Sequence, residues 1–295
     1  MKNSLTNISA LCLYLLPLAL LTGPFLPDLF ISLIGIIFIY FSVSEKKWHY
    51  YINKFFIFFL IFTVYLILIS LISKHTFHSL TSSLFYFRFG LFSLGVWYLL
   101  ENKLNVINIF SISIFVTFVI ALVDGYIQYF FGMNIFGFKG EGVRMTLLLN
   151  DENILGGYLS RLFPLLIGSI IISFAEKKSY LYFGFILLIF TDVLIYITGE
   201  RTAFGLLFIS TFYIIFLISK YKLFRIATFT ISLLIIILIT FFNPSIKDRN
   251  IDHTLNQIGI NDDSDEMILF SKDHHKYAIT SFRIFKENPF FGMGP

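Results

Sequence analysis

The feature that most constrains this chain is a succession of long apolar runs separated by short polar stretches. A helix needs about 20 apolar residues to cross a hydrocarbon core of about 30 Å. The runs approach or reach this length and fill most of the chain up to residue 242. Charged residues make up 14% of the chain, whereas soluble domains carry about 25%. The sequence therefore predicts an all-α, polytopic helical membrane protein.

We expect about nine transmembrane spans, which form one helical bundle over residues 1–242. The first apolar run follows Lys2 and resembles a signal peptide, but no small-residue cleavage site follows it and a second run begins at once. We therefore interpret it as a retained span. The expected spans are residues 8–22, 28–43, 55–73, 84–100, 105–131, 154–174, 180–198, 202–219 and 224–242.

The basic residues of the loops predict the orientation, because cytoplasmic loops are rich in Lys and Arg. The balance favours a cytoplasmic N-terminus. Residues 132–153 and the polar tail 243–295 then lie outside, and we expect the tail to form short helices on the membrane surface. The inner residues are Lys2, Lys46, Lys47, Lys54, Lys103, Lys177, Lys178, Lys220, Lys222 and Arg225, and the outer ones before residue 243 are Lys74, Lys139, Arg144 and Arg201.

Ionisable side chains also fall inside the expected spans, at Arg88, Asp124, Arg161 and Asp192. Such groups are costly in hydrocarbon and usually face a bundle interior or a wet cavity. On the predicted topology they all lie in the outer half of the membrane. They indicate a polar cavity that opens to the outer side. The alternative is a set of structural ion pairs, Arg88 with Asp124 and Arg161 with Asp192.

Three further residues belong to this region. Gln128 lies four residues after Asp124 and therefore shares its helix face. Glu200 and Arg201 lie at the outer end of the seventh expected span. We interpret Glu200 as a partner of Arg201, which would hold the carboxylate ionised, and a general base is the alternative.

The excess of arginine suggests an anionic ligand. The arginine fork matches phosphate and diphosphate oxygens, and it stays charged at any working pH. A lipid-linked anion could keep its tail in the bilayer and place its diphosphate in an outward-facing cavity. The sequence offers no support for nucleic-acid binding or a cofactor.

Metal binding is likewise not indicated. Cys12 is the single cysteine, so neither an intramolecular disulfide nor a cysteine-based metal site can form. The acidic run Asp262–Glu266 lacks the glycine and distal glutamate of a calcium loop, and we interpret it as a solvated loop.

Four strings of residues occur in a characteristic order. They are Asp124 through Tyr129, Gly142-Val143-Arg144 with Asn153 through Pro164, Gly199-Glu200-Arg201-Thr202-Ala203-Phe204, and Glu287 through Pro295. Together they resemble the O-antigen ligase and O-antigen polymerase family of bacterial inner-membrane proteins. The resemblance covers most of the chain.

The resemblance implies an inverting glycosyltransferase that works at the periplasmic face without a metal. Its donor would be a glycan on undecaprenyl diphosphate, and its acceptor another lipid-linked glycan, lipid A core or a protein. The arginines that bind the diphosphate in the family match Arg144 and Arg201, and depth in the spans adds Arg88 and Arg161. The candidate substrate-binding residues are Arg144, Arg201, Arg88 and Arg161, and the supporting residues are Asp124, Gln128 and Glu200.

The resemblance also bears on the end of the sequence. In the family, Gly-x-Gly-Pro is followed by the rest of a large outer loop, with a histidine motif that supplies the base, and by further spans. We therefore expect residues 243–295 to be the start of a large periplasmic loop, apparently truncated, with the catalytic base beyond residue 295. His274 and His275 precede Gly-x-Gly-Pro and are interpreted as loop residues.

Two other functions are compatible with the composition. A transporter or flippase of a lipid-linked or small anionic solute is the main alternative, although such folds tend to show internal repeats and charges at the midplane. No repeat is evident here, and the charges are displaced to the outer side. A structural or assembly subunit without chemistry is the other alternative.

Overall fold

The computed structural model describes residues 2–142, 144–149, 152–174, 178–258 and 272–294. Within these residues the backbone is helical, with turns, loops and one isolated antiparallel bridge between Met133 and Lys139. The predicted all-α class is confirmed. Several positions used above lie outside the described residues, namely Val143, Lys177, the acidic run Asp262–Glu266 and Pro295.

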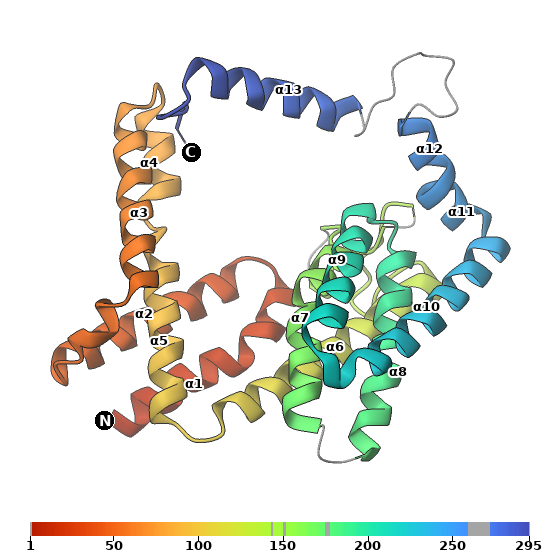
Figure 1. Cartoon of the computed structure of the whole chain (residues 1–295), viewed down its shortest axis with the longest axis horizontal. Coiled ribbons are helices and arrows are strands. Elements are labelled where there is room, and N and C mark those ends of the chain that lie inside the picture. The colour runs from red at the N-terminus through yellow and green to blue at the C-terminus, as the bar shows by residue number, and fades with distance from the viewer. Residues whose placement is uncertain (1, 143, 150–151, 175–177, 259–271, 295) are drawn as a thin grey trace. The chain divides into compact units, whose positions relative to one another are not determined.

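The elements follow one another along the chain, and a long loop joins α6 to α7 (Figure 1). The last long apolar helix, α10, ends at Phe242, and the tail then forms short helices. The elements are α1 (Lys2–Ala19), η1 (Leu20–Thr22), α2 (Phe25–Ser44), η2 (Trp48–Tyr51), α3 (Lys54–Ile72), α4 (Thr76–Ser83), α5 (Phe87–Asn102), α6 (Val106–Phe131), α7 (Leu155–Phe174), α8 (Lys178–Ile197), α9 (Arg201–Leu217), η3 (Ser219–Tyr221), α10 (Lys222–Phe242), α11 (Pro244–Lys247), η4 (Asp248–Asp252), α12 (His253–Ile258) and α13 (Lys272–Glu287).

Seven helical segments of the described chain are long and apolar enough to cross a membrane. The other two expected spans correspond to shorter apolar helices, Tyr182–Ile197 and Arg201–Leu217. At 1.5 Å per residue a helix of 17 residues is about 25 Å long, which is less than a typical hydrocarbon core. The seven segments are Lys2–Thr22, Phe25–Ser44, Lys54–Ile72, Thr76–Asn102, Val106–Phe131, Leu155–Ile172 and Lys222–Phe242.

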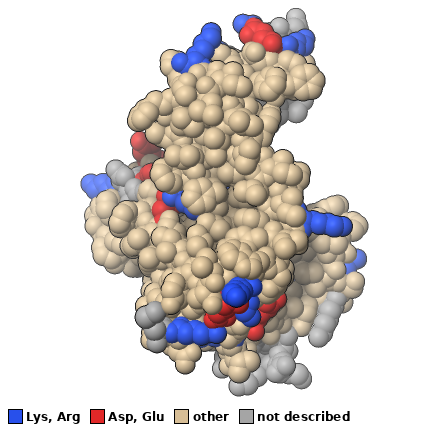
Figure 2. Space-filling model, turned by 90° about the vertical axis from the view of Figure 1, so that its left-hand side faces the viewer, with Lys and Arg blue, Asp and Glu red and all other residues tan. Residues whose placement is uncertain are grey.

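The surface agrees with a membrane location. On the face shown in Figure 2, charged side chains are sparse and are separated by broad uncharged areas. Many large apolar side chains of the long helices are exposed, such as Phe58 of α3 and Phe241 of α10. Because such surface is stable only away from water, the chain is a membrane-embedded helical protein. The count of nine spans stays a prediction.

The chain divides into two compact units, each described here by itself. Unit 1 comprises Met1–Leu13, Asp28–Val106 and Asn256–Pro295, and unit 2 comprises Tyr14–Pro27 and Ile107–Leu255.

Unit 1 is packed around a small aromatic core. Glycines of α5 allow close helix contacts, since a Cβ at Gly95 would come within 2.8 Å of Ile34 in α2 and one at Gly90 within 2.6 Å of Phe59 in α3. Small residues at helix interfaces let backbones approach closely in membranes. The buried core residues are Ile37, Phe38, Phe41, Tyr50, Phe56, Leu94 and Tyr98.

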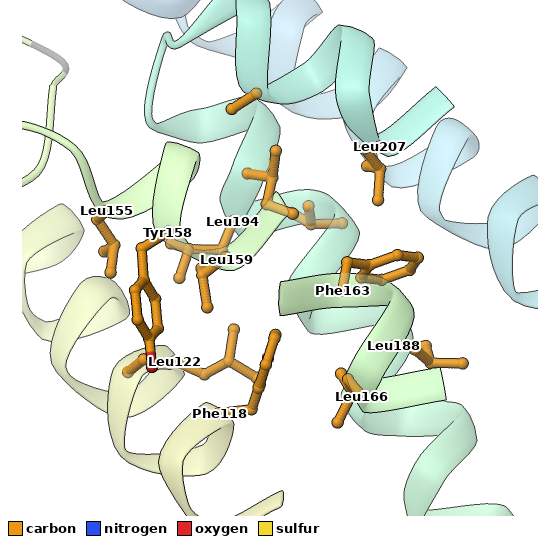
Figure 3. Close-up of a cluster of buried hydrophobic side chains, with 14 of the residues drawn as sticks. Phe118, Leu122, Leu155, Tyr158, Leu159, Phe163, Leu166, Leu188, Leu194 and Leu207 are labelled. Carbon is orange, nitrogen blue, oxygen red and sulfur yellow. The ribbon is translucent and has the colours of Figure 1, made fainter. Parts of the chain in front are cut away.

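Unit 2 has a larger core, built around α7. In the apolar stretch of α7, 61% of the residues are buried, against 22–39% in the other candidate spans. Side chains of α6, α7, α8 and α9 gather in one cluster, which includes Phe118, Leu159, Leu194 and Leu207 (Figure 3). Because α7 is held on several sides, its N-terminal end is a fixed point on which a site can be built.

Candidate functional site

The turn between α8 and α9 positions the first part of the site. α8 ends at Ile197, and Gly199 has a φ of 65°, in the left-handed region that favours glycine. The chain therefore reverses sharply, and Arg201 becomes the first residue of α9, directly after Glu200. This is the local reason for the string Gly199-Glu200-Arg201.

Glu200 joins this turn to the start of α7. Its Oε1 accepts a hydrogen bond from the N–H of Gly156 and its Oε2 one from the N–H of Gly157, both at 2.8 Å. The first N–H groups of a helix have no partner within the helix, and a carboxylate there is favourable. A Cβ at Gly156 would collide with the hydroxyl of Thr198. The strings at residues 153–164 and 199–204 therefore meet in space.

The environment of Glu200 corrects one expectation. Burial raises the pKa of its carboxyl, although the two N–H groups and the charges of Arg144 and Arg161 oppose the shift. The sequence predicts instead that the neighbouring Arg201 makes the carboxylate less basic. The outcome differs because removal from water outweighs nearby charges. Glu200 thus acts as a half-buried link between α7 and α9.

Asp124 and Gln128 hold the loop that carries Arg144. Oδ1 of Asp124 accepts a hydrogen bond from the N–H of Ile135 at 2.9 Å. The Gln128 amide donates to the hydroxyl of Thr146 at 2.9 Å and accepts from its N–H at 3.0 Å. The shared helix face of these two residues therefore serves to fix the loop, and Gln128 also lines a cavity beside Arg144.

Three arginines come together at the site. Arg144 and Arg249 line one hollow of about 410 Å³. Both lie close enough to Arg201 for their positive charges to repel that of its guanidinium. Burial, and then repulsion from Arg144, lowers the pKa of the Arg249 guanidinium. The Nε of Arg249 is buried and has no hydrogen-bond partner within the described part of the chain. We call Arg144, Arg201 and Arg249 the arginine cluster.

An apolar cavity of about 620 Å³ adjoins the cluster at Arg201. Its walls come from α8, α9, α10 and the tail segment after α10, and Lys247 adds a second cation. Two of its wall residues, Ile237 and Phe241, are 63% and 80% exposed, so this wall also belongs to the outer surface of α10. The lining residues are Tyr196, Arg201, Phe204, Ile236, Ile237, Thr240, Phe241, Lys247, Asn250, Ile251 and Thr254.

Arg161 completes the part of the predicted site that lies in unit 2. It follows Gly157 by one helical turn on α7, and its charge acts on Glu200. The structure thus brings Arg144, Arg161 and Arg201 into one neighbourhood. Arg88 belongs to unit 1, where its guanidinium donates to Asp28 at 2.9 Å in a half-exposed ion pair.

The alternative ion pairs are wrong. Asp192 pairs with Arg225, because α8 and α10 pack together and bring the two side chains face to face. The guanidinium donates to both carboxylate oxygens, at 2.8 and 3.1 Å, and both residues are fully buried. Asp124 bonds the backbone of Ile135 in unit 2, and its expected partner Arg88 bonds Asp28 in unit 1.

The Asp192–Arg225 pair connects four helices. Ser232 of α10 donates to Asp192 at 3.0 Å, and Nε of Arg225 donates to Thr211 of α9 at 3.2 Å. The guanidinium also lies 4.7 Å from the centre of the Phe163 ring of α7. This pair is therefore a structural node of unit 2. It forms no part of the predicted outer cavity.

Sequence reasoning missed Lys247, Arg249 and the partner of Arg225. The two tail cations lie just after Asn243-Pro244, where the Asn243 side chain caps the short helix α11. An asparagine followed by proline is a helix-start signal that could have drawn attention to them. No signal in the sequence specifies that α10 is aligned to place Arg225 opposite Asp192.

Comparisons with known proteins identify no relative of this chain. No family model matches the chain, and neither a curated protein nor a solved structure is significantly similar to it. The function must therefore be argued from the geometry and the residues of this chain.

Proposed function

We propose that the protein transfers a glycan from a polyprenyl diphosphate to an acceptor hydroxyl at the periplasmic face of a bacterial inner membrane. The observation that carries this proposal is the arginine cluster beside an apolar cavity. The cluster and the cavity together suit an amphiphile that has a multiply charged head and a long apolar tail. A diphosphate-linked lipid has both parts.

The arginines would supply the main catalytic contribution. When the acceptor oxygen attacks the anomeric carbon, the bond to the diphosphate breaks and negative charge develops on the leaving group. Cations that are already in place stabilise that charge without reorganising. Arg201 is fixed at the start of α9 by the Gly199 turn, and Arg144 by the loop that Gln128 holds. The site would thus be preorganised for inverting transfer.

The remaining details of the proposal follow the sequence. The donor is an undecaprenyl-diphosphate-linked glycan, and the acceptor is a lipid-linked glycan, lipid A core or a protein. The N-terminus lies in the cytoplasm, so the arginine cluster faces the periplasm. Glu200 has a positioning role, because its two oxygens are engaged by the backbone of α7.

Replacement of Arg201 in the native gene tests this function. We expect Arg201→Ala to lower glycan transfer by about 100-fold or more, since removal of one preorganised donor has that effect in related electrostatic sites. Arg201→Lys should restore only part of the activity, because a lysine cannot reproduce the planar fork. Surface glycan on a gel, normalised to the amount of protein in the membrane, is the measurement.

The control is Lys139→Ala, an exposed residue of the outer loop between α6 and α7 that lines none of the cavities described above. It should leave the glycan unchanged. A wild-type amount of surface glycan in cells that carry Arg201→Ala at a normal protein level would contradict the proposal. Purified protein in vesicles provides a second test. Movement of labelled lipid-linked sugar across the bilayer without transfer to an acceptor would identify a flippase.

A further inference from the structure

The tail helix α13 has two distinct faces. At 3.6 residues per turn, Tyr277, Phe282 and Phe285 fall within one arc of about 140°. Lys276, Arg283 and Lys286 fall within an adjacent arc of about 80°. Lys286 lies 4.8 Å from the centre of the Phe282 ring, at the border between the two faces.

The aromatic face of α13 has no protein covering in the described chain. Tyr277, Phe282 and Phe285 are 68%, 58% and 58% exposed. Three exposed aromatic side chains on one side of a helix are unfavourable in water, where each exposes a large apolar area. A partner must therefore cover this face.

The segment after α13 fixes the position of the helix. The hydroxyl of Tyr65 in α3 donates to the carbonyl of Phe290, and Ser73 donates to the carbonyl of Met293 at 3.0 Å. Gly294 has a φ of 105°, and a Cβ there would lie 2.6 Å from the Ser73 hydroxyl. Gly294 thus lets the backbone approach Ser73 closely, just past the end of α3.

The end of α3 marks the edge of the hydrocarbon. α3 is the most apolar of the candidate spans, and it stops at Ile72, just before Ser73 and Lys74. The attachment therefore holds α13 at the level where a membrane meets water. In Figure 1, α13 leaves this end of the α3–α4 pair at a steep angle to α3. A helix in this position can lie along the membrane surface.

We propose that α13 is a membrane-surface helix that binds anionic phospholipid headgroups of the surrounding bilayer. Its aromatic residues enter the boundary between headgroups and acyl chains, and Lys276, Arg283 and Lys286 contact the lipid phosphates. Aromatic residues on one face and basic residues on the other are typical of interfacial helices. Basic side chains near an anionic surface strengthen such binding. The lipid contact does not depend on the glycan-transfer proposal.

A fluorescent probe on the full chain tests the contact. Cys12→Ser removes the single cysteine, and Phe282→Cys then takes an environment-sensitive label. The matched control is Thr280→Cys, which is exposed and lies on the opposite side of α13. The protein is placed in vesicles of phosphatidylcholine alone or mixed with phosphatidylglycerol. Quenching by lipids that carry a spin label just below the headgroup reports the depth.

We expect the Phe282 probe to be quenched strongly in vesicles with phosphatidylglycerol and the Thr280 probe to stay in water. Replacement of Lys276, Arg283 and Lys286 by glutamine should lower the membrane-bound fraction of α13 about tenfold or more. Equal exposure of both probes to water would overturn the proposal. So would a buried Phe282 probe that responds to neither lipid quencher nor lipid charge, because a protein surface would then cover the helix.

Discussion

A single carboxylate links the starts of two helices in unit 2. Glu200 precedes Arg201 in the turn that opens α9. Its two carboxylate oxygens accept hydrogen bonds from the N–H groups of Gly156 and Gly157 at the start of α7. Any change that moves Glu200 therefore moves the first residue of α9 as well. The position of Arg201 depends on contacts that do not involve its own side chain.

The glycines under Glu200 give the first prediction at this scale. Gly156→Ala should destabilise the protein by about 1–3 kcal/mol, since the added Cβ would collide with Thr198 and approach Glu200. The matched control is Gly168→Ala in the same helix, where a Cβ meets no atom within 4 Å. That variant should be neutral or more stable by up to about 1 kcal/mol, because alanine favours helix.

Thermal unfolding in nanodiscs measures both variants. Diphosphate binding in the same samples shows whether the shift at Gly156 reaches Arg201. An equally stable Gly156→Ala protein with wild-type binding would mean that Glu200 is not held by the start of α7.

At the scale of elements, the Asp192–Arg225 pair determines how α8, α9 and α10 pack. Removal of one partner leaves a buried charge, so Asp192→Asn or Arg225→Met should cost about 3–5 kcal/mol. The double variant Asp192→Leu with Arg225→Met should recover much of that loss, because an apolar pair can replace a buried ion pair.

The half-exposed pair of Arg88 with Asp28 serves as the control. Its side chains are 31% and 48% exposed, so Arg88→Met should cost no more than about 1 kcal/mol. Unfolding in mild detergent compares all four variants. A double variant as unstable as the worse single variant would show that the charges themselves, and not their pairing, are required.

The helices also show how much of the fold can be predicted from the sequence. The lengths of the apolar runs located the long helices, because a bilayer imposes both the length and the composition of a span. Segment 76–83, which lies between two expected spans, is helix α4. It packs against α3, where the Ser83 hydroxyl is hydrogen-bonded to that of Ser70 at 2.8 Å, and Ser79 donates to the hydroxyl of Ser73 at 3.0 Å. Asp192 found an unexpected partner because the alignment of two packed helices depends on side-chain fit that periodicity does not encode.

The sequence likewise predicted some residues of the site and missed others. The family resemblance led to Arg144 and Arg201, and the position of Glu200 beside Arg201 led to Glu200; the structure brings the three together. Arg249 and Lys247 were missed because their approach depends on the path of the tail after α10. A tail that mixes charged and apolar residues gives no periodic signal for such a path.

At the scale of the whole molecule, the number of crossings can be tested directly. In a Cys12→Ser background, Lys139→Cys should react with a membrane-impermeant maleimide in intact cells, and Leu104→Cys should not. If α8 and α9 both cross, Lys222→Cys should behave like Leu104→Cys. Labelling of Lys222→Cys from outside would mean that one of these shorter helices does not cross.

The exposed wall of the apolar cavity has a consequence for how the protein meets its ligand. Ile237 and Phe241 are exposed on α10 and also line the cavity, so this wall offers a lipid a lateral route to Arg201. If the proposed lipid-linked donor is the ligand, encounter is diffusion in two dimensions, and the rate depends on the number of donor molecules per unit area of membrane. Dilution with buffer should leave turnover unchanged, whereas dilution with inert lipid should slow it.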